Sequence, residues 1–187
     1  MSIDNIKKDS EHSMKHSVEF LIEEFKGIRT GRANIAILDS IQVDAYGSGK
    51  MPLNQLGNLS TPDSKTIVIE PWDKSVVSPI EKAIQASSLG LNPQNDGRVI
   101  RIPIPPLTEE RRKEFVKFVK NKAEEAKVAV RNIRRDANEK LKAAQKNHEI
   151  SEDEEKKAHD EIQKLTDKYI EKIDTATHDK EKDLMEV

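Results

Sequence analysis

Residues 108–147 read TEERRKEFVKFVKNKAEEAKVAVRNIRRDANEKLKAAQKN, a run that contains neither glycine nor proline. Its apolar and small residues recur at alternating steps of three and four, so they lie along one face of a helix. They are Val119, Ala123, Ala126, Val130, Ile133, Ala137, Leu141 and Ala144. The small side chains indicate close contacts with neighbouring helices. Thr108 is suited to cap the helix, and Glu109 and Glu110 suit the positive end of its dipole. The pattern predicts a helix that ends at about Asn147.

Two further amphipathic patterns lie toward the two ends of the chain. One follows steps of four and three from Met14 to Ile28 and predicts a helix that ends near Thr30 and Gly31. The other follows a capping-box sequence at residues 151–154. Its apolar positions are Ala158, Ile162, Leu165, Tyr169, Ile173 and Ala176. Three apolar stripes of this kind bury one another best in a bundle, so we expect a long three-helix bundle.

The segment between the first and second helices has a different composition. Six of the seven glycines and all eight prolines lie between Gly31 and Pro106. Short β-branched or alternating runs predict strands at 41–45, 66–69 and 99–104, with a turn at 47–49 and a short helix at 75–88. We therefore predict an α+β protein in which residues 30–106 form a small inserted α+β (β/α/β) domain. Residues 1–29 and 107–187 then form the discontinuous three-helix bundle.

The composition limits the classes of protein to which the chain can belong. Charged residues make up 35% and aromatic residues 4% of the 187 residues, whereas a typical domain is about 25% charged, so much of the chain is solvated surface. It has no cysteine, which excludes disulfides, thiolate metal sites and a cysteine nucleophile. We recognise neither a secretory signal nor an apolar run long enough to span a membrane, and expect a cytoplasmic protein.

The charges are divided unevenly between the two longest helices. Residues 107–147 carry 13 Lys and Arg against 7 Asp and Glu, whereas residues 148–187 carry 7 against 14. On a helical projection several cations of the second helix fall on one side, away from Val130 and Ile133. They are Lys113, Lys120, Lys127, Arg131 and Arg134, and we call them the basic ridge. Guanidinium groups bind phosphate oxygens in pairs, so structured RNA fits this ridge. Pairing with the acidic third helix explains the charges equally well, and both can hold.

The chain shows no recognisable catalytic or metal-binding pattern. Residues 47–50 read GSGK but lack the spacing of a phosphate-binding loop, and we interpret them as a hairpin turn. His12 and His16 are four residues apart without a third ligand, which favours solvated side chains. Trp72 could stack on a base, but a lone tryptophan more often anchors a small core, and we predict the core position.

Seven short motifs in succession resemble the ribosome recycling factors. They are Gly31-Arg32-Ala33, Pro52-Leu53-Asn54-Gln55, Pro71-Trp72-Asp73-Lys74, Leu89-Gly90-Leu91-Asn92-Pro93, Asn95-Asp96-Gly97, Leu107-Thr108-Glu109-Glu110-Arg111-Arg112 and Val130-Arg131-Asn132-Ile133-Arg134-Arg135-Asp136-Ala137. The resemblance covers essentially the whole chain in order, and the last two motifs are the most specific. It implies an L-shaped molecule of tRNA-like dimensions, with a hinged smaller domain.

The resemblance also implies a function and a set of functional residues. A member of this family binds large-subunit rRNA of the post-termination ribosome, and elongation factor G with GTP then separates the subunits. Arg131 and Arg134 match the family's RNA-contacting arginines. From the ridge geometry we add Lys120, Lys127 and Arg135. A further set is suited to either hinge structure or RNA contact: Arg29, Thr30, Gly31, Arg32, Pro105 and Pro106.

Several properties are expected to be absent from this protein, and two other classes of protein also fit the sequence patterns. We expect no enzymatic activity, no metal, no membrane association and no cofactor, because GTP belongs to the partner elongation factor. We also expect a monomer. A coiled-coil scaffold that recognises a protein through its helices is the first alternative. An enzyme acting on RNA is the second and the weaker one, because no acid–base or metal constellation is recognisable.

Overall fold

A computed structural model describes residues 2–28 and 30–186 of the chain. The chain divides into two compact units. The first comprises Met1–Lys26 and Lys113–Lys182, and the second comprises Gly27–Arg112 and Asp183–Val187. Helices make up the first unit, whereas the second contains short strands, 3-10 turns and one short α-helix.

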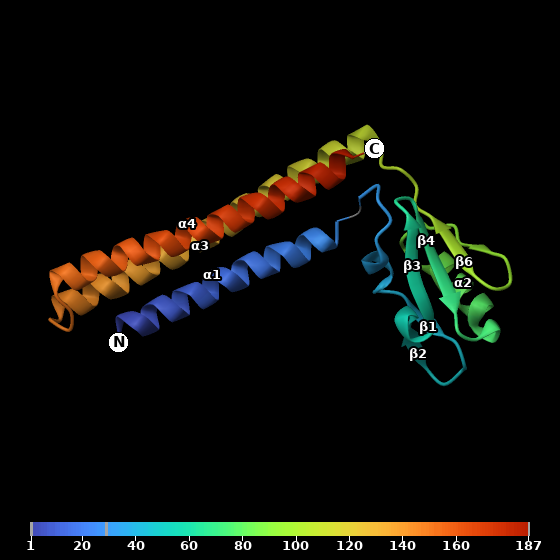
Figure 1. Ribbon diagram of the computed structural model, residues 1–187, viewed down its shortest axis with the longest axis horizontal. Helices are drawn as coiled ribbons and strands as arrows, with labels where there is room; N and C mark the ends of the chain where they lie inside the picture. Colours follow the sequence, from blue (N-terminus) through green and yellow to red (C-terminus); the bar gives the residue numbers. More distant parts are fainter. Residues whose placement is uncertain (1, 29, 187) are drawn as a thin grey trace. The chain divides into compact units, whose positions relative to one another are not determined.

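Three long helices lie side by side in the first unit (Figure 1). They are α1 (Ile3–Lys26), α3 (Glu109–Lys146, 38 residues) and α4 (Glu152–Met185, 34 residues). This confirms the predicted three-helix bundle. The predicted end of the first helix near Thr30 and Gly31 is wrong, because α1 ends at Lys26. The apolar spacing continues to Ile28, but a helix pattern does not by itself mark the last hydrogen-bonded turn.

The predicted caps are present at the start of both longer helices. The Arg111 amide donates to Thr108 Oγ1 at 3.2 Å. At the start of α4 the Glu154 amide donates to Ser151 Oγ at 3.2 Å, while the Ser151 amide donates to the Glu154 carboxylate at 2.8 Å. This reciprocal pair satisfies two amides that a helix leaves without partners, and it starts α4 directly after the α3–α4 connection.

The core of the bundle contains the predicted stripes, with small and polar residues among the apolar ones. On α3 every predicted stripe residue is buried except Ile133, which is partly exposed. On α4 the hydroxyl of Thr166 is buried and donates to the Ile162 carbonyl at 2.9 Å. Ser10 on α1 donates to the Ile6 carbonyl at 2.7 Å in the same way. Because these hydroxyls are satisfied within their own helices, they cost little when the helices pack.

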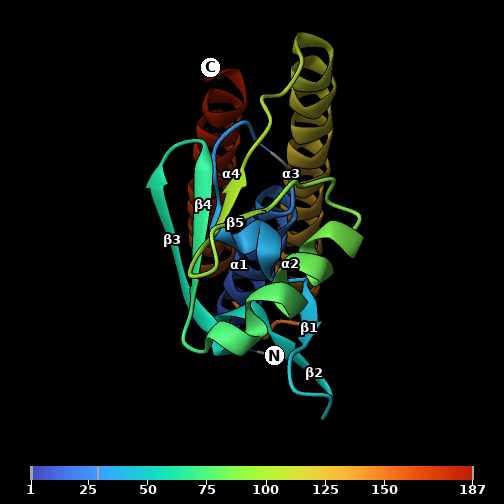
Figure 2. The ribbon, with the colours of Figure 1, turned by 90° about the vertical axis from the view of Figure 1, so that its right-hand side faces the viewer.

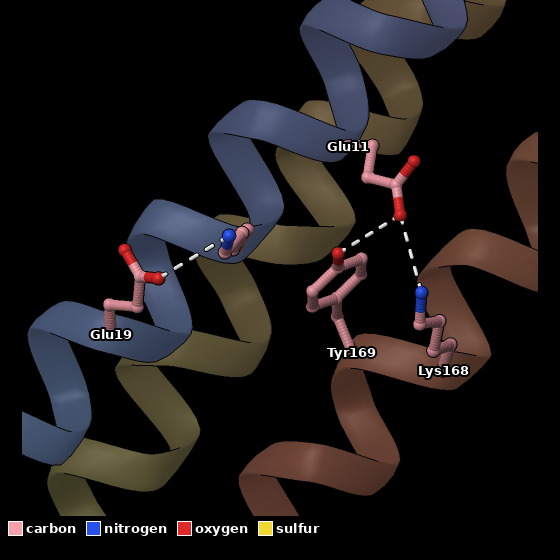
Figure 3. Close-up of polar contacts among 5 residues, drawn as sticks. Glu11, Glu19, Lys168 and Tyr169 are labelled. Carbon is pink, nitrogen blue, oxygen red and sulfur yellow. Dashed lines mark hydrogen bonds and ion pairs between the residues drawn. The ribbon is translucent and has the colours of Figure 1, made fainter.

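Polar contacts tie α1 to α4 at the edge of this core. Figure 3 shows the Glu11 carboxylate of α1 accepting hydrogen bonds from Tyr169 and Lys168 of α4. The oxygen–oxygen distance to Tyr169 is 3.1 Å, and the distance to Lys168 Nζ is 3.3 Å. Nearer the start of α1, Lys7 forms an ion pair with Glu161.

The second unit is built on antiparallel strands (Figure 2). A hairpin joins β1 (Gln42–Asp44) to β2 (Lys50–Pro52). A separate four-stranded sheet has the order β3-β4-β6-β5. Its strands are β3 (Gly57–Asp63), β4 (Thr66–Pro71), β5 (Gln94–Asn95) and β6 (Ile100–Pro103). Apart from the ends of α3 and α4, the described residues of this unit form one α-helix, α2 (Val77–Ala86). They also form three 3-10 turns: η1 (Ile35–Leu38), η2 (Leu53–Gln55) and η3 (Lys74–Val76).

Aliphatic side chains from the hairpin, the sheet and α2 form one continuous core in the second unit. Ile67 and Ile69 of β4, Ile100 of β6 and Ile80 of α2 are fully buried in it. The predicted strands, turn and short helix are confirmed at their approximate positions. Pro79 lies in the first turn of α2, where its missing amide hydrogen costs no helical bond.

Two predictions about the second unit are wrong or incomplete. The strand β3 was not predicted, since it reads GNLSTPD and lies at an edge of the sheet. Its side chains are mostly exposed and its pairing with β4 is irregular between Ser60 and Asp63, so it lacks an apolar pattern. The core position predicted for Trp72 is also wrong, because 71% of this residue is exposed. Its amide donates to the Leu56 carbonyl at 3.1 Å, which holds the backbone while the ring faces solvent.

Candidate RNA-binding surface on the bundle

The basic ridge lies beside α4 within the bundle. Lys127 Nζ is 2.5 Å from the Asp174 carboxylate of α4. Seven residues further along α3, Arg134 Nη1 donates to Gln163 Oε1 of α4 at 3.1 Å. Two ridge cations therefore reach across the seam between α3 and α4. The predicted pairing of basic α3 with acidic α4 is confirmed at Lys127, and it coexists with exposed cations elsewhere on the ridge.

The other predicted RNA contacts lie on α3 with different surroundings. Arg131 is half-buried, and its Nη1 is 3.3 Å from the Glu124 carboxylate of the same helix. Lys120 and Arg135 are exposed. Because these cations recur over about four turns of one rigid helix, the spacing between their charges is largely preset. A surface of this kind suits a repeated polyanion better than a small ligand.

The described residues predicted to serve as a hinge or in RNA contact lie in two places: Thr30, Gly31 and Arg32 follow α1, and Pro105 and Pro106 precede α3. The Arg32 guanidinium is 3.6 Å from the Asp183 carboxylate and 3.1 Å from the Glu186 carboxylate. The Arg32 amide donates to Thr30 Oγ1 at 3.4 Å. A Cβ on Gly31 would have the Leu107 amide nitrogen as its near neighbour, at 3.9 Å. Arg32 is thus engaged with carboxylates, which favours a structural role over RNA contact. Pro105 and Pro106 are exposed, and Arg29 lies outside the described residues.

Carboxylate and amide side chains of α4 complete the surface, and the sequence did not single them out. Gln163 and Asp174 contact ridge cations directly. Asp167 accepts a hydrogen bond from Gln163 Nε2 at 2.9 Å. Their spacing on α4, at four and seven residues, places them on one side of that helix. No local sequence signal could have identified them, because these contacts depend on how α3 and α4 pack against each other.

The described residues offer no alternative site of a familiar kind. They contain no group of three or more His, Cys, Asp or Glu side chains placed to hold a metal ion. Within the same described part of the chain, no helix has the length and apolar character needed to cross a bilayer. Grooves in the bundle are shallow surface features, such as one of about 560 Å³ between α1 and α4 that is bordered by Lys15, Tyr169 and Lys172.

The fold places the chain in the α+β class, with a long three-helix bundle and a small antiparallel unit. A family model described as "Ribosome recycling factor" matches residues 21–185. The chain belongs to the ribosome recycling factor family. The ribosome-recycling factor of Symbiobacterium thermophilum is 54% identical over 182 residues, which cover 97% of this chain and 98% of the relative. The ribosome-recycling factor of Legionella pneumophila strain Paris is 54% identical over 185 residues, with 99% and 100% covered.

Solved structures agree with the sequence relatives. A solution structure of the ribosome recycling factor matches with a TM-score of 0.78 and 46% identity, covering 100% of this chain and 99% of the other. A second match has a TM-score of 0.67 and 46% identity, with 100% of both chains covered. It is described as models for the T. thermophilus ribosome recycling factor and the E. coli elongation factor G bound to the E. coli post-termination complex.

Proposed function

We propose that this chain is a ribosome recycling factor that binds the post-termination ribosome and, with elongation factor G and GTP, promotes its dissociation into subunits. The observation that carries the proposal is identity of 54% with ribosome-recycling factors over nearly the whole of both chains. Such identity spans the bundle and the small unit together. A relative of known structure is described together with elongation factor G on the post-termination complex, which supports the same partners here.

At the level of residues, the bundle docks on large-subunit rRNA through the ridge cations of α3. Arg134 and Arg131 are the central contacts, and Lys120, Lys127 and Arg135 extend the surface on either side. Guanidinium groups bind phosphate oxygens through paired hydrogen bonds. Two arginines one turn apart therefore orient the bundle on the RNA as well as bind it there. The protein supplies position, and the GTP bound by the elongation factor supplies the work.

The proposal includes what the chain itself does not do. It acts in the cytoplasm as a monomer, hydrolyses nothing and holds no cofactor. The absence of cysteine and the lack of a recognisable nucleophile, base and orienter in the sequence support a binding role.

A subunit-splitting assay tests the function directly. Post-termination ribosomes are incubated with the purified protein, elongation factor G and GTP, and the products are separated by sedimentation. Free subunits are expected in the complete mixture and not when the protein, the elongation factor or GTP is omitted. Intact particles in the complete mixture, with no protein bound to them, would contradict the proposal.

The Arg134→Ala variant tests the surface. Its free energy of binding to isolated large ribosomal subunits is expected to be weaker by about 1 to 3 kcal/mol, because a charge-assisted contact is lost. Binding is measured between 50 and 200 mM salt, where affinity that depends on several phosphate contacts falls roughly tenfold or more. The matched control is Arg98→Ala, an exposed arginine of the second unit. Equal affinities of the two variants would show that Arg134 is not part of the RNA-binding surface. An affinity that does not change with salt would favour a protein partner.

A further inference from the structure

The ridge cations differ in the charge of the groups that hold them. Lys127 faces the Asp174 carboxylate, and Arg131 faces the Glu124 carboxylate. Arg134 instead contacts a neutral amide, Gln163, across the seam. A carboxylate partner offsets the charge that an incoming phosphate would meet, whereas an amide oxygen holds a guanidinium and leaves its charge intact.

The orientation of the Gln163 amide follows from its two neighbours. An arginine side chain only donates hydrogen bonds, and an ionised aspartate only accepts them. Gln163 therefore directs Oε1 to Arg134, at 3.1 Å, and Nε2 to Asp167, at 2.9 Å. The reverse orientation would face donor against donor and acceptor against acceptor. Asp167 thus fixes the amide, and the amide fixes Arg134.

The contact uses only part of the guanidinium. Gln163 accepts from Nη1, and this is the hydrogen bond that Arg134 makes within the described part of the chain. The edge formed by Nε and Nη2 remains for an anion, and that edge presents two parallel donors matched to two phosphate oxygens. Arg134 is partly buried, so its surroundings and the hydrogen bond together limit its rotamers before RNA arrives. Preorganisation of this kind lowers the entropic cost of binding.

We propose that Gln163 is a positioning residue for Arg134: α4 holds the guanidinium through a neutral acceptor so that its charge and its Nε/Nη2 edge face rRNA phosphate. This inference rests on the proposed function and adds α4 to a surface otherwise made by α3. It also assigns a role to the neutrality of residue 163, because a carboxylate at the same place would make the same hydrogen bond and weaken the site.

Gln163→Glu is the decisive variant, since it is nearly isosteric and changes the charge. Its affinity for isolated large ribosomal subunits at low salt is expected to fall about tenfold, with a salt slope shallower by about one unit, because one phosphate contact is neutralised. Asn5→Asp adds the same charge to an exposed position on α1 and is expected to change affinity less than about twofold. Gln163→Ala, which removes the acceptor without adding charge, is expected to weaken binding about two- to fivefold.

The same substitutions in an Arg134→Ala background show whether Gln163 acts through Arg134. Neither Gln163→Glu nor Gln163→Ala is then expected to weaken binding further by more than about twofold. Helical content and melting temperature of each variant are compared with the wild type. Losses that persist without Arg134, or a Gln163→Glu variant that binds like the wild type, would overturn the inference while leaving ribosome binding intact. A wild-type protein that does not bind the subunits would instead contradict the proposed function itself.

Discussion

The two units of this chain bury their side chains in different ways. Among the described residues, fifteen aliphatic side chains of the second unit form one core, and most are at or near zero exposure. The bundle buries stripes in which alanines are mixed with larger residues, and its core includes the hydroxyl of Thr166. A dense core leaves little tolerance for change, because each lost methyl group leaves a cavity. A long, thin core instead gives much surface per residue, and here that surface carries the charged contacts.

Ile80→Ala against Ile133→Ala makes the same chemical change in the two regions. Ile80 of α2 is fully buried in the core of the second unit, so its truncation is expected to cost about 2 to 5 kcal/mol of stability. Ile133 of α3 is partly exposed and is expected to cost less, about 1 to 2 kcal/mol, because less contact is lost. Urea unfolding measures both, and amide hydrogen exchange locates the loss. Equal losses would show that the two units do not differ in packing tolerance.

Gly57→Ala tests the close approach of backbone in the second unit. A Cβ at Gly57 would lie 2.6 Å from the Glu70 carbonyl oxygen and 2.8 Å from Pro71 Cα, which are backbone atoms of β4. The two strands must separate to admit it, so we expect a loss of about 1 to 3 kcal/mol in urea unfolding. Gly31→Ala is the control, because its Cβ would meet only ordinary van der Waals distance to the Leu107 amide. An unchanged free energy of unfolding in the Gly57→Ala variant would show that the edge strand can shift to admit the methyl group at little cost.

The helices of the bundle could be predicted from the sequence more completely than the strands of the second unit. The stripe of α3 and the caps at Thr108 and Ser151 were predicted because periodicity and capping depend on residues a few positions apart. The strand β3 was missed because an exposed edge strand has no apolar alternation. The exposure of Trp72 could not be predicted, since composition gives only the usual preference of a residue type.

The candidate surface shows the same limit. The cations of α3 were recognised from their own helix, because their angular positions follow from spacing alone. Their partners on α4 depend on how two helices rotate against each other. Arg134 and Gln163 are 29 residues apart, and neither residue carries a local signal of the other. Sequence patterns therefore predicted the ridge but not which of its charges are held by carboxylates.

Asp174→Asn tests whether a carboxylate partner reduces the contribution of a ridge cation to RNA binding. It removes the carboxylate that faces Lys127 at 2.5 Å, so Lys127 can contribute more to phosphate binding. Affinity for isolated large ribosomal subunits is expected to rise about two- to threefold at low salt, with a steeper salt slope. Asp179→Asn is the matched control, because it removes the same charge from α4 at the groove shared with α1. Equal gains from both variants would show an effect of net charge alone.

The smallest expected effect concerns the contact between α1 and α4 (Figure 3). Hydrogen bonds from Lys168 and then Tyr169 lower the pKa of Glu11 below its ordinary value of 4.5. A lowered pKa in the folded state means that the contact stabilises the bundle above the ordinary pKa, and that this gain is lost as the pH falls through the lowered pKa. Because the Glu11 side chain is 43% exposed, the gain is only ~0.5 kcal/mol after solvent screening. The free energy of unfolding in urea should therefore be higher for the wild type than for Glu11→Gln at pH 7, and the difference should shrink below pH 4.5.

Glu19→Gln is the matched control. It removes the same charge from α1 but breaks a contact within that helix, to Lys15 at 3.8 Å, so its smaller loss isolates the contribution of the contact between helices. A Glu11→Gln deficit that persists unchanged in acid would show that packing, and not the ionised carboxylate, joins α1 to α4.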